Sequence, residues 1–390
     1  MKYIIFLCVF FMNFLSFATT IAAEEEHSLL LDTEGKAWAT GNNEYGQLGL
    51  GDDISIVEIA TKIEGLPRII AVAAGYSHSL FLDEEGNVWA TGSNKDGQLG
   101  LGDNVNTVQV PTKINNLPPI KAVAAGYNHS LFLDEEGNVL ATGSNTWGQL
   151  GLGDNVNTVQ VPTKINNLPP IKAVATRGFH SLFLDKEGNV WATDSNKEGQ
   201  LALGDNVNRE VPTKINNLPA IKAIAAGVEY SLFLDMESSV WATGDNISGQ
   251  LGLGDDENRN IPTKIDTLPT IKAVAAGDNH SLFLDEKGNV WATGINDWGQ
   301  LGLGDNENRN IPTKIDTLPT IKAVAAGTHS LFLDEEGNVW ATGSNAWCQL
   351  GLGDDENRNI PTKIDTLPTI EKPLSERGKI PTKSARKIVE

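Results

Sequence analysis

A heptapeptide that returns seven times constrains the fold of this 390-residue chain more than any other feature. Its sequence is GQLGLGD, with Ala at the fourth position of one copy and Cys at the first position of another. The copies are spaced 49 to 51 residues apart and begin at Gly46, Gly97, Gly148, Gly199, Gly249, Gly299 and Cys348. A fixed period of this length indicates a repeat architecture, in which each unit buries its apolar surface against its neighbours.

Within each unit, short β-branched and aromatic runs alternate with Gly, Asn, Asp and Pro, and none is long enough to show the period of a helix. In the last unit we predict four strands, at Ile321–Ala326, Ser330–Leu333, Val339–Thr342 and near Pro361–Ile364. The segment between the second and third strands, such as 134–138, is typical of a tight hairpin whose glycine has a positive φ.

One such unit cannot bury both faces of its sheet, whereas seven units arranged radially bury them all. The sequence therefore predicts an all-β fold, a seven-bladed β-propeller with four short antiparallel strands in each repeat of about 50 residues. The propeller is expected to span residues 19–370. An open solenoid of the same units is the alternative.

The N-terminal segment 1–18 is typical of a secretory signal peptide. Lys2 precedes the apolar run 3–17, and small residues follow it. The run is short for a membrane span of about 20 residues, although an uncleaved anchor is the alternative. We expect cleavage after Ala18 rather than Ala23, because the later cut would remove the first strand of the first unit. The chain is therefore expected to be secreted or periplasmic, without a membrane span after cleavage.

Acidic residues outnumber basic ones by 50 to 30, which gives a formal charge of −20. This balance argues against nucleic acid as a partner, because phosphate binding needs a clustered basic face. Residues 371–390 contain six basic and three acidic residues and are expected to form a flexible tail. Signal cleavage removes Cys8 and leaves Cys348, which cannot form a disulfide within the chain and which we expect to be exposed.

No residue pattern predicts catalysis, a cofactor or a metal ion. The histidines share one repeat position, so a propeller spreads them around a ring, and we expect each to make one structural hydrogen bond, with Tyr230 in its place in the fifth unit. They are His27, His78, His129, His180, His280 and His329. The heptapeptide lacks the Lys-Ser/Thr of a phosphate loop. The acidic segments at Asp103 and Asp255 lack the Gly and Glu of a calcium loop, and solvated loops are expected there.

Positions that differ between the copies are free to encode function. Two such positions recur in each repeat. The first precedes the heptapeptide, and the second lies between the first and second strands. In an up-and-down blade both positions emerge at the same end of the blade. The opposite end carries acidic turns. Aromatic residues beside acids and amides indicate a protein-binding face. Its candidate residues are Tyr45, Tyr76, Tyr127, Trp147, Phe179, Trp298 and Trp347. The alternative is that each tryptophan covers its own turn.

The pattern VAAGxxHSLFLDxxGxVWATGxNxxGQLGLGD resembles the repeat of the regulator of chromosome condensation family over residues 19–370. The resemblance implies a seven-bladed propeller and a small GTPase as a possible partner. Exchange-factor members of that family insert a β-wedge into the GTPase. The regular spacing here leaves no copy with such an insertion, which argues against exchange by that route.

Together these features predict a non-catalytic, exported and monomeric propeller that binds a protein partner through its aromatic-bearing face. Modulation of a small GTPase is the alternative that the resemblance implies. A secreted enzyme inhibitor, similar to the β-lactamase inhibitory propellers, is a further one. The fourth unit departs most from the others, with Thr176-Arg177, Asp194 and Ala202, and the sequence alone assigns it no role.

Overall fold

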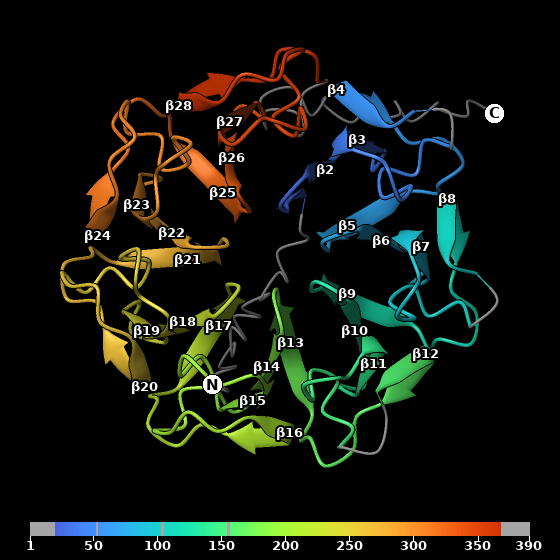
Figure 1. The fold of residues 1–390 in the computed structure, drawn as a ribbon, viewed down its shortest axis with the longest axis horizontal. Helices are drawn as coiled ribbons and strands as arrows, with labels where there is room; N and C mark the ends of the chain where they lie inside the picture. The colour runs from blue at the N-terminus through green and yellow to red at the C-terminus, as the bar shows by residue number, and fades with distance from the viewer. Residues whose placement is uncertain (1–19, 52–53, 103–104, 154–156, 368–390) are drawn as a thin grey trace, which may run out of the picture.

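The computed structural model describes residues 20–51, 54–102, 105–153 and 157–367, and these residues form seven four-stranded antiparallel sheets. Figure 1 shows the sheets arranged as blades around a central axis. The predicted seven-bladed propeller is thus confirmed. The expected signal peptide (1–18) and tail (371–390) lie outside the described residues. Within the described ranges, no helix is long and apolar enough to cross a membrane.

Each blade is built from four consecutive strands that run from the axis to the rim. The innermost strands are β1 (Ile21–Ala23), β5 (Ile69–Ala74), β9 (Ile120–Ala125), β13 (Ile171–Thr176), β17 (Ile221–Ala226), β21 (Ile271–Ala276) and β25 (Ile321–Ala326). The second strands are β2 (His27–Leu31), β6 (His78–Asp83), β10 (His129–Asp134), β14 (His180–Asp185), β18 (Tyr230–Asp235), β22 (His280–Asp285) and β26 (His329–Asp334).

The third and fourth strands complete each blade and differ in exposure, since the fourth lies at the rim. The third strands are β3 (Ala37–Asn42), β7 (Val88–Ser93), β11 (Val139–Ser144), β15 (Val190–Asp194), β19 (Val240–Gly244), β23 (Val290–Gly294) and β27 (Val339–Gly343). The fourth strands are β4 (Ile56–Lys62), β8 (Thr107–Lys113), β12 (Thr158–Lys164), β16 (Arg209–Lys214), β20 (Arg259–Lys264), β24 (Arg309–Lys314) and β28 (Arg358–Lys363).

The apolar core lies between neighbouring blades rather than within one sheet. The second strand of every blade is buried along its whole length, which explains the nearly continuous apolar sequence HSLFLD. Leu182 and Leu184 of the fourth blade, for example, share a buried cluster with Phe233 of the fifth. No blade can therefore bury its own surface without the next one, as the repeat pattern predicts.

The ring closes without exchange of a strand between the first and last blades, because every sheet consists of consecutive strands. β1 contacts β25 and β26, which excludes the open solenoid. At the joint between the last and first blades, the two backbones also form an isolated antiparallel β-bridge between Ile59 and Leu352. The residue after Ile59 is Ala60, whereas the other fourth strands have proline at this position. Alanine keeps the backbone N–H that proline lacks, so the backbone can pair here.

Candidate functional site

Both variable positions of the repeat lie on one face of the disc. We call the connection between the first and second strands the AB turn, that between the second and third the BC turn, and that between the third and fourth the CD loop. In the second blade, Ser93 N at the end of β7 donates to Ser77 O in the AB turn at 2.8 Å. Ser144 N and Asn128 O make the same bond in the third blade. We call this side, formed by AB turns and CD loops, the variable face.

In every CD loop, a buried asparagine and a buried glutamine each accept a backbone hydrogen bond through the side-chain oxygen. In the fourth blade, Asn196 Oδ1 accepts from Leu201 N at 2.9 Å, and its Nδ2 donates to Asp205 O at 2.8 Å. Gln200 Oε1 accepts from the backbone N of Glu198, the variable residue, at 3.1 Å. The equivalent glutamine bond, 2.9 to 3.0 Å long, holds the N–H of Tyr45, Asp96, Trp147, Ser248, Trp298 and Trp347. The backbone of the variable residue is thus fixed in all seven blades, while its side chain differs.

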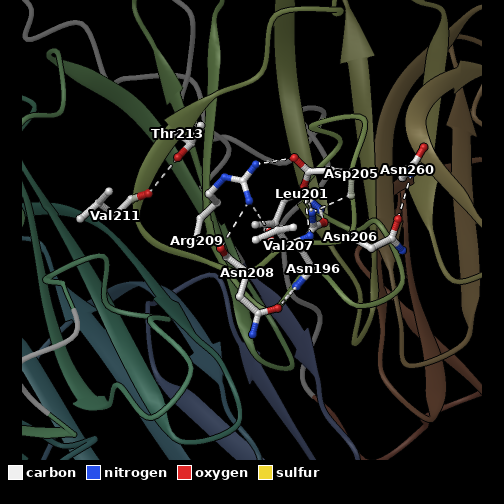
Figure 2. A network of polar contacts seen from close by, with 10 residues as sticks. All are labelled: Asn196, Leu201, Asp205, Asn206, Val207, Asn208, Arg209, Val211, Thr213 and Asn260. Carbon is white, nitrogen blue, oxygen red and sulfur yellow. Dashed lines mark hydrogen bonds and ion pairs between the residues drawn. The ribbon is translucent and has the colours of Figure 1, made fainter.

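An ion pair four residues apart stabilises the CD loop of the fourth blade, as Figure 2 shows. Arg209 Nη2 lies 2.6 Å from Asp205 Oδ2, and Val207 N donates to Asp205 Oδ1 at 3.0 Å. Asn260 Nδ2 donates to Asn206 Oδ1 at 2.9 Å and so links this loop to the fifth blade. The same pair recurs as Asp255–Arg259, Asp305–Arg309 and Asp354–Arg358.

The ion pair between Asp and Arg occupies a carboxylate of one acidic segment that resembles a calcium-binding loop. Asp255 is engaged by Arg259, and backbone and side-chain hydrogen bonds hold the pKa of its carboxyl below the usual range. Asp103 lies outside the described residues. Among the residues that are described, no group of three or more His, Cys, Asp or Glu side chains is placed to hold a metal ion.

The histidines form a ring of hydrogen bonds that joins each blade to the next. His78 Nε2 lies 2.9 Å from Ser130 Oγ of the following blade, and Ser130 Oγ donates to Gln98 O at 2.7 Å. Because Ser130 donates its hydroxyl proton to this carbonyl, the hydrogen in its bond with His78 must come from His78 Nε2. Tyr230 takes the histidine position in the fifth blade, where its hydroxyl donates to His280 O and lies 3.1 Å from Ser281 Oγ, which donates to Gln250 O. The predicted structural role of these residues is confirmed, and burial lowers the pKa of His78 to about 3.

The aromatic residues of the CD loops lie at the surface of the variable face. Trp147 and Trp298 are each 44% exposed, and Trp347 is 37% exposed. Lys95 Nζ lies 4.9 Å from the ring centre of Tyr45, and Lys197 Nζ lies equally far from that of Trp147. These are cation–π contacts between the loops of neighbouring blades.

Sequence reasoning missed Ile247, the most exposed large apolar side chain of the described chain at 73%. It lies in the CD loop of the fifth blade, one residue before Ser248, the variable residue of that loop. An apolar residue at a variable loop position was the signal that could have found it.

The aromatic residues of the AB turns form a row nearer the axis. The ring centres of Tyr76 and Tyr127 lie 5.4 Å apart, and those of Tyr127 and Phe179 lie 5.2 Å apart in an edge-to-face arrangement. Tyr127 N also donates to Arg177 O at 3.0 Å. The structure therefore brings three of the candidate residues into contact. The ring contacts found in the described chain do not join Tyr45, Trp298 and Trp347, which come from neighbouring blades.

A buried ion pair crosses the axis beside this row. Five AB turns contain glycine after the innermost strand, whereas the first and fourth blades have Glu24 and Arg177 there. Arg177 Nη1 lies 3.2 Å from Glu24 Oε2, and Arg177 Nε donates to Asp278 Oδ1 of the sixth blade at 2.9 Å. Nη1 also donates to Ala326 O of the seventh blade at 2.7 Å. We call these three residues, Glu24, Arg177 and Asp278, the axial clasp; it gives the divergent fourth blade a structural role.

Glu24 and Arg177 of the axial clasp are buried and line a cavity of about 260 Å³ along the axis, whose other lining residues are mainly Ala and Val of the innermost strands. Arg177 is 6% exposed and Glu24 is 2% exposed. Burial raises the pKa of Glu24, although the charge of Arg177 opposes the shift. The neighbouring Glu25 has its pKa raised to about 7 by burial and then by Asp278 and Glu26.

The expectation of an exposed thiol at Cys348 is wrong. Its side chain is only 5% exposed, and burial raises the pKa of the thiol. Cys348 occupies the first position of the heptapeptide with a φ of 61°. At this position in the other repeats, a Cβ points toward the outermost strand of the next blade, as at Gly299 and Asn359. The residue is therefore covered by the joint between the last and first blades.

Comparison with known proteins places this geometry in a family. Residues 11–273 match the RCC1-like domain, and residues 287–333 and 336–373 match the regulator of chromosome condensation (RCC1) repeat. The chain belongs to the RCC1-like repeat family. A further match to the RCC1 repeat, over residues 271–300, includes Asp278, so the family match extends over both the axial clasp and the variable face.

Curated relatives in this RCC1-like family share the repeats but are longer proteins. Human protein RCC2 is 47% identical over 128 residues, which are 32% of this chain and 24% of RCC2. The probable E3 ubiquitin-protein ligase HERC6 of human is 37% identical over 47% of this chain and 18% of its own length. The ultraviolet-B receptor UVR8 of Arabidopsis thaliana is 31% identical over 48% of this chain and 44% of its own. The matched part spans less than half of each of these relatives.

Solved structures show the same RCC1-like architecture. Prp20p of Saccharomyces cerevisiae, described with its binding properties to Gsp1p and histones, has a TM-score of 0.77 and 27% identity. The match covers 89% of this chain and 87% of Prp20p. Human WBSCR16 matches with a TM-score of 0.77 at 22% identity, over 84% of this chain and 93% of that one, and this likeness concerns the fold.

Proposed function

We propose that this RCC1-like propeller is a non-catalytic interaction module that binds a protein partner through its variable face. The observation that carries the proposal is the contrast between a constant scaffold and variable side chains. The same glutamine bond fixes the loop backbone in each blade, yet the side chain beside it is Trp in three blades and polar, charged or Tyr in the others. Exposed tryptophans within a polar surround have the composition of binding hot spots.

The roles of the reactive side chains support the non-catalytic part of the proposal. The histidines are buried, and their Nε2 atoms are engaged by serines of the next blade, so they are not free to exchange protons with a substrate. The burial that lowers their pKa keeps them neutral, which suits a structural hydrogen bond rather than acid–base catalysis.

Site-specific photo-crosslinking tests this proposal. A photoreactive amino acid is placed at Asp297, beside Trp298 on the variable face, or at Glu286, in a BC turn on the opposite face. The full chain is then incubated with proteins from its natural surroundings, and crosslinked species are identified by mass spectrometry. We expect a discrete partner from position 297 and none from 286. Equal products from both positions, or from 286 alone, would overturn the assignment of the face.

Regulation of a small GTPase is the second function that we propose to test, because the relatives supply a specific reason. One of them is named X-linked retinitis pigmentosa GTPase regulator, with 39% identity to the human protein over 39% of this chain. Release of labelled nucleotide from a panel of small GTPases measures this activity. Acceleration that Trp298→Ala abolishes would support it, and no acceleration on any member would reject it.

We further propose that the chain is exported and that cleavage after Ala18 precedes folding. The structure adds an argument, because β1 begins at Ile21 and both Ile21 and Ala23 are buried in the core that joins the last and first blades. Cleavage after Ala23 would remove this strand. N-terminal sequencing of the mature protein is expected to read Thr19 first, and a sequence that begins at Glu24 would contradict the proposal.

A further inference from the structure

Two aromatic rings of the variable face are each covered by a lysine from the next blade. Lys95 Nζ of the second blade lies 4.9 Å from the ring centre of Tyr45 in the first, and Lys197 Nζ of the fourth lies 4.9 Å from that of Trp147 in the third. Both lysines occupy one repeat position, the residue just before the variable residue of the loop. Neighbouring CD loops are therefore placed so that a ring from one blade holds a cation from the next.

Trp298 and Trp347 occupy the same loop position as these rings, but the blade that follows each of them supplies no lysine. The repeat position that carries Lys197 in the fourth blade is Ala346 in the blade after Trp298 and Glu44 in the blade after Trp347. The cation–π contacts within the described chain accordingly involve neither tryptophan. Both rings offer the aromatic surface for a cation without having one.

The loop geometry at Trp298 matches that at Trp147. The glutamine side chain of the loop accepts from Trp147 N and from Trp298 N at the same distance, 3.0 Å. The two side chains are also exposed to the same fraction. The place that Lys197 takes over Trp147 is open over Trp298, because the next loop carries only the methyl group of an exposed alanine, Ala346.

The charge around the uncovered rings also favours a cation. Asp297 directly precedes Trp298, Glu44 lies in the blade after Trp347, and both carboxylates are exposed. Neither is among the carboxylates that pair with lysine or arginine in the described ranges. Unpaired carboxylates beside an aromatic ring attract a cationic side chain and repel an anionic one.

We propose that Trp298 and Trp347 bind lysine or arginine side chains of the protein partner, in the place that a lysine of this chain holds at the covered rings. The inference rests on the proposed function, since it names the chemistry of the partner at the same face. The covered rings show that the loop geometry accommodates a cation, and the exposed carboxylates complement its charge. Arginine suits the site well because its planar guanidinium also stacks on an indole.

Two-dimensional NMR of the full chain, with nitrogen-15 in its tryptophan indoles, follows each ring separately. The probes are a blocked Gly-Arg-Gly peptide and the neutral Gly-citrulline-Gly peptide, which has nearly the same shape. We expect the arginine peptide to shift the Trp298 and Trp347 signals to saturation, and the citrulline peptide to bind at least about fivefold more weakly. The Trp147 signal is expected to respond only after Lys197→Ala uncovers its ring. Equal binding of the two peptides, or equal responses of Trp147 and Trp298 in the original chain, would overturn the inference.

A pair of matched variants separates the ring site from general charge. Ala346→Lys supplies the missing lysine and is expected to weaken the arginine peptide at Trp298 about fivefold. Thr146→Lys adds the same charge at the same repeat position, where the preceding blade has Asp96 instead of a ring, and is expected to weaken it less than about twofold. Equal effects of the two variants would overturn the inference. Against a protein partner captured by crosslinking, loss of binding in Trp298→Ala but not in Ala346→Lys would overturn this inference and leave the proposed function standing.

Discussion

At the scale of single residues, Asp194 shows how a repeat tolerates a departure from its pattern. The other six copies have glycine at this position, where φ is positive, and Asp194 keeps a φ of 99°. Both of its carboxyl oxygens are buried without a hydrogen-bond partner, and burial raises the pKa to about 8. Backbone strain and a buried carboxyl both destabilise the fold.

We predict that Asp194→Gly stabilises the protein by about 1–3 kcal/mol through relief of backbone strain alone. Because the native state keeps its proton up to a higher pH than the unfolded chain, the original protein loses stability as pH rises from about 4 to 8. The advantage of the variant therefore grows over that range, by up to about 1.4 kcal/mol per pH unit. Denaturant unfolding at pH 5 and pH 8 measures it.

Asp194→Asn is the matched control, since it removes the charge but keeps a side chain at positive φ. It is expected to lose the pH dependence while recovering less stability than the glycine variant. A glycine variant less stable than the original chain at pH 8 would refute the assignment of strain to this residue.

At the scale of elements, the contact between second strands of neighbouring blades holds the ring together. Each histidine donates to the serine of the next blade. That serine in turn donates to a glutamine carbonyl of the blade that carries the histidine. Removing the serine leaves two buried groups without partners, which costs more than the net value of one hydrogen bond.

We predict that Ser130→Ala lowers the free energy of unfolding by about 2–4 kcal/mol, because His78 Nε2–H and Gln98 O both lose their partner. Thr112→Ala, which removes an exposed hydroxyl bonded within its own strand, is the control and should change stability by less than about 0.5 kcal/mol. Urea unfolding compares the two. Equal effects would show that the contact between blades contributes no more than a surface hydroxyl.

The neutral histidines also make the fold sensitive to acid. Burial lowers the pKa of His78 to about 3 in the folded chain, whereas it is about 6.5 when unfolded, so unfolding takes up a proton between these values. Stability from this residue is complete above about pH 6.5 and falls as pH decreases toward 3. His78→Gln is expected to reduce the proton uptake on unfolding at pH 5 by about one. An unchanged uptake in potentiometric unfolding would contradict a neutral histidine.

The repeat made these elements predictable from sequence, because each strand and each histidine contact occurs in several copies. Strand bounds agree to within one to three residues, as with Ser330–Leu333 predicted and His329–Asp334 observed. Burial of Cys348 was not predictable, because it depends on the first blade lying against the last. The contact of Glu24 with Arg177 joins residues far apart in sequence, although their opposite charges at one repeat position were visible.

At the scale of the whole molecule, the axial clasp connects blades that are not neighbours. Arg177 of the fourth blade binds groups in the first, sixth and seventh, so it ties the N-terminal turn to the far side of the ring. A buried ion pair adds little stability over apolar packing of the same volume. Removing only one of its partners, however, leaves a buried charge unpaired, and the resulting loss of stability can be measured.

We predict that Arg177→Gly, which restores the repeat residue, destabilises the fold by about 3–5 kcal/mol, because Glu24 and Asp278 then lack a buried cation. Glu24→Gly combined with Arg177→Gly should recover part of that loss, because Asp278 still lacks its cation. A double-mutant cycle measures the coupling, expected at about 1–3 kcal/mol. Additive effects of the two substitutions would show that the pair does not act as a unit.

The central claim is that only the side chains of the variable face select a partner. Its most direct test is the dissociation constant of the crosslinked partner for the chain with Trp298→Ala and Trp347→Ala, against Glu335→Gln with Glu336→Gln on the opposite face. With the melting temperature unchanged in both, we predict a loss of about 2 kcal/mol or more, roughly thirtyfold, for the tryptophan variant alone. An unchanged constant for the tryptophan variant, or an equal loss in both, would contradict the claim.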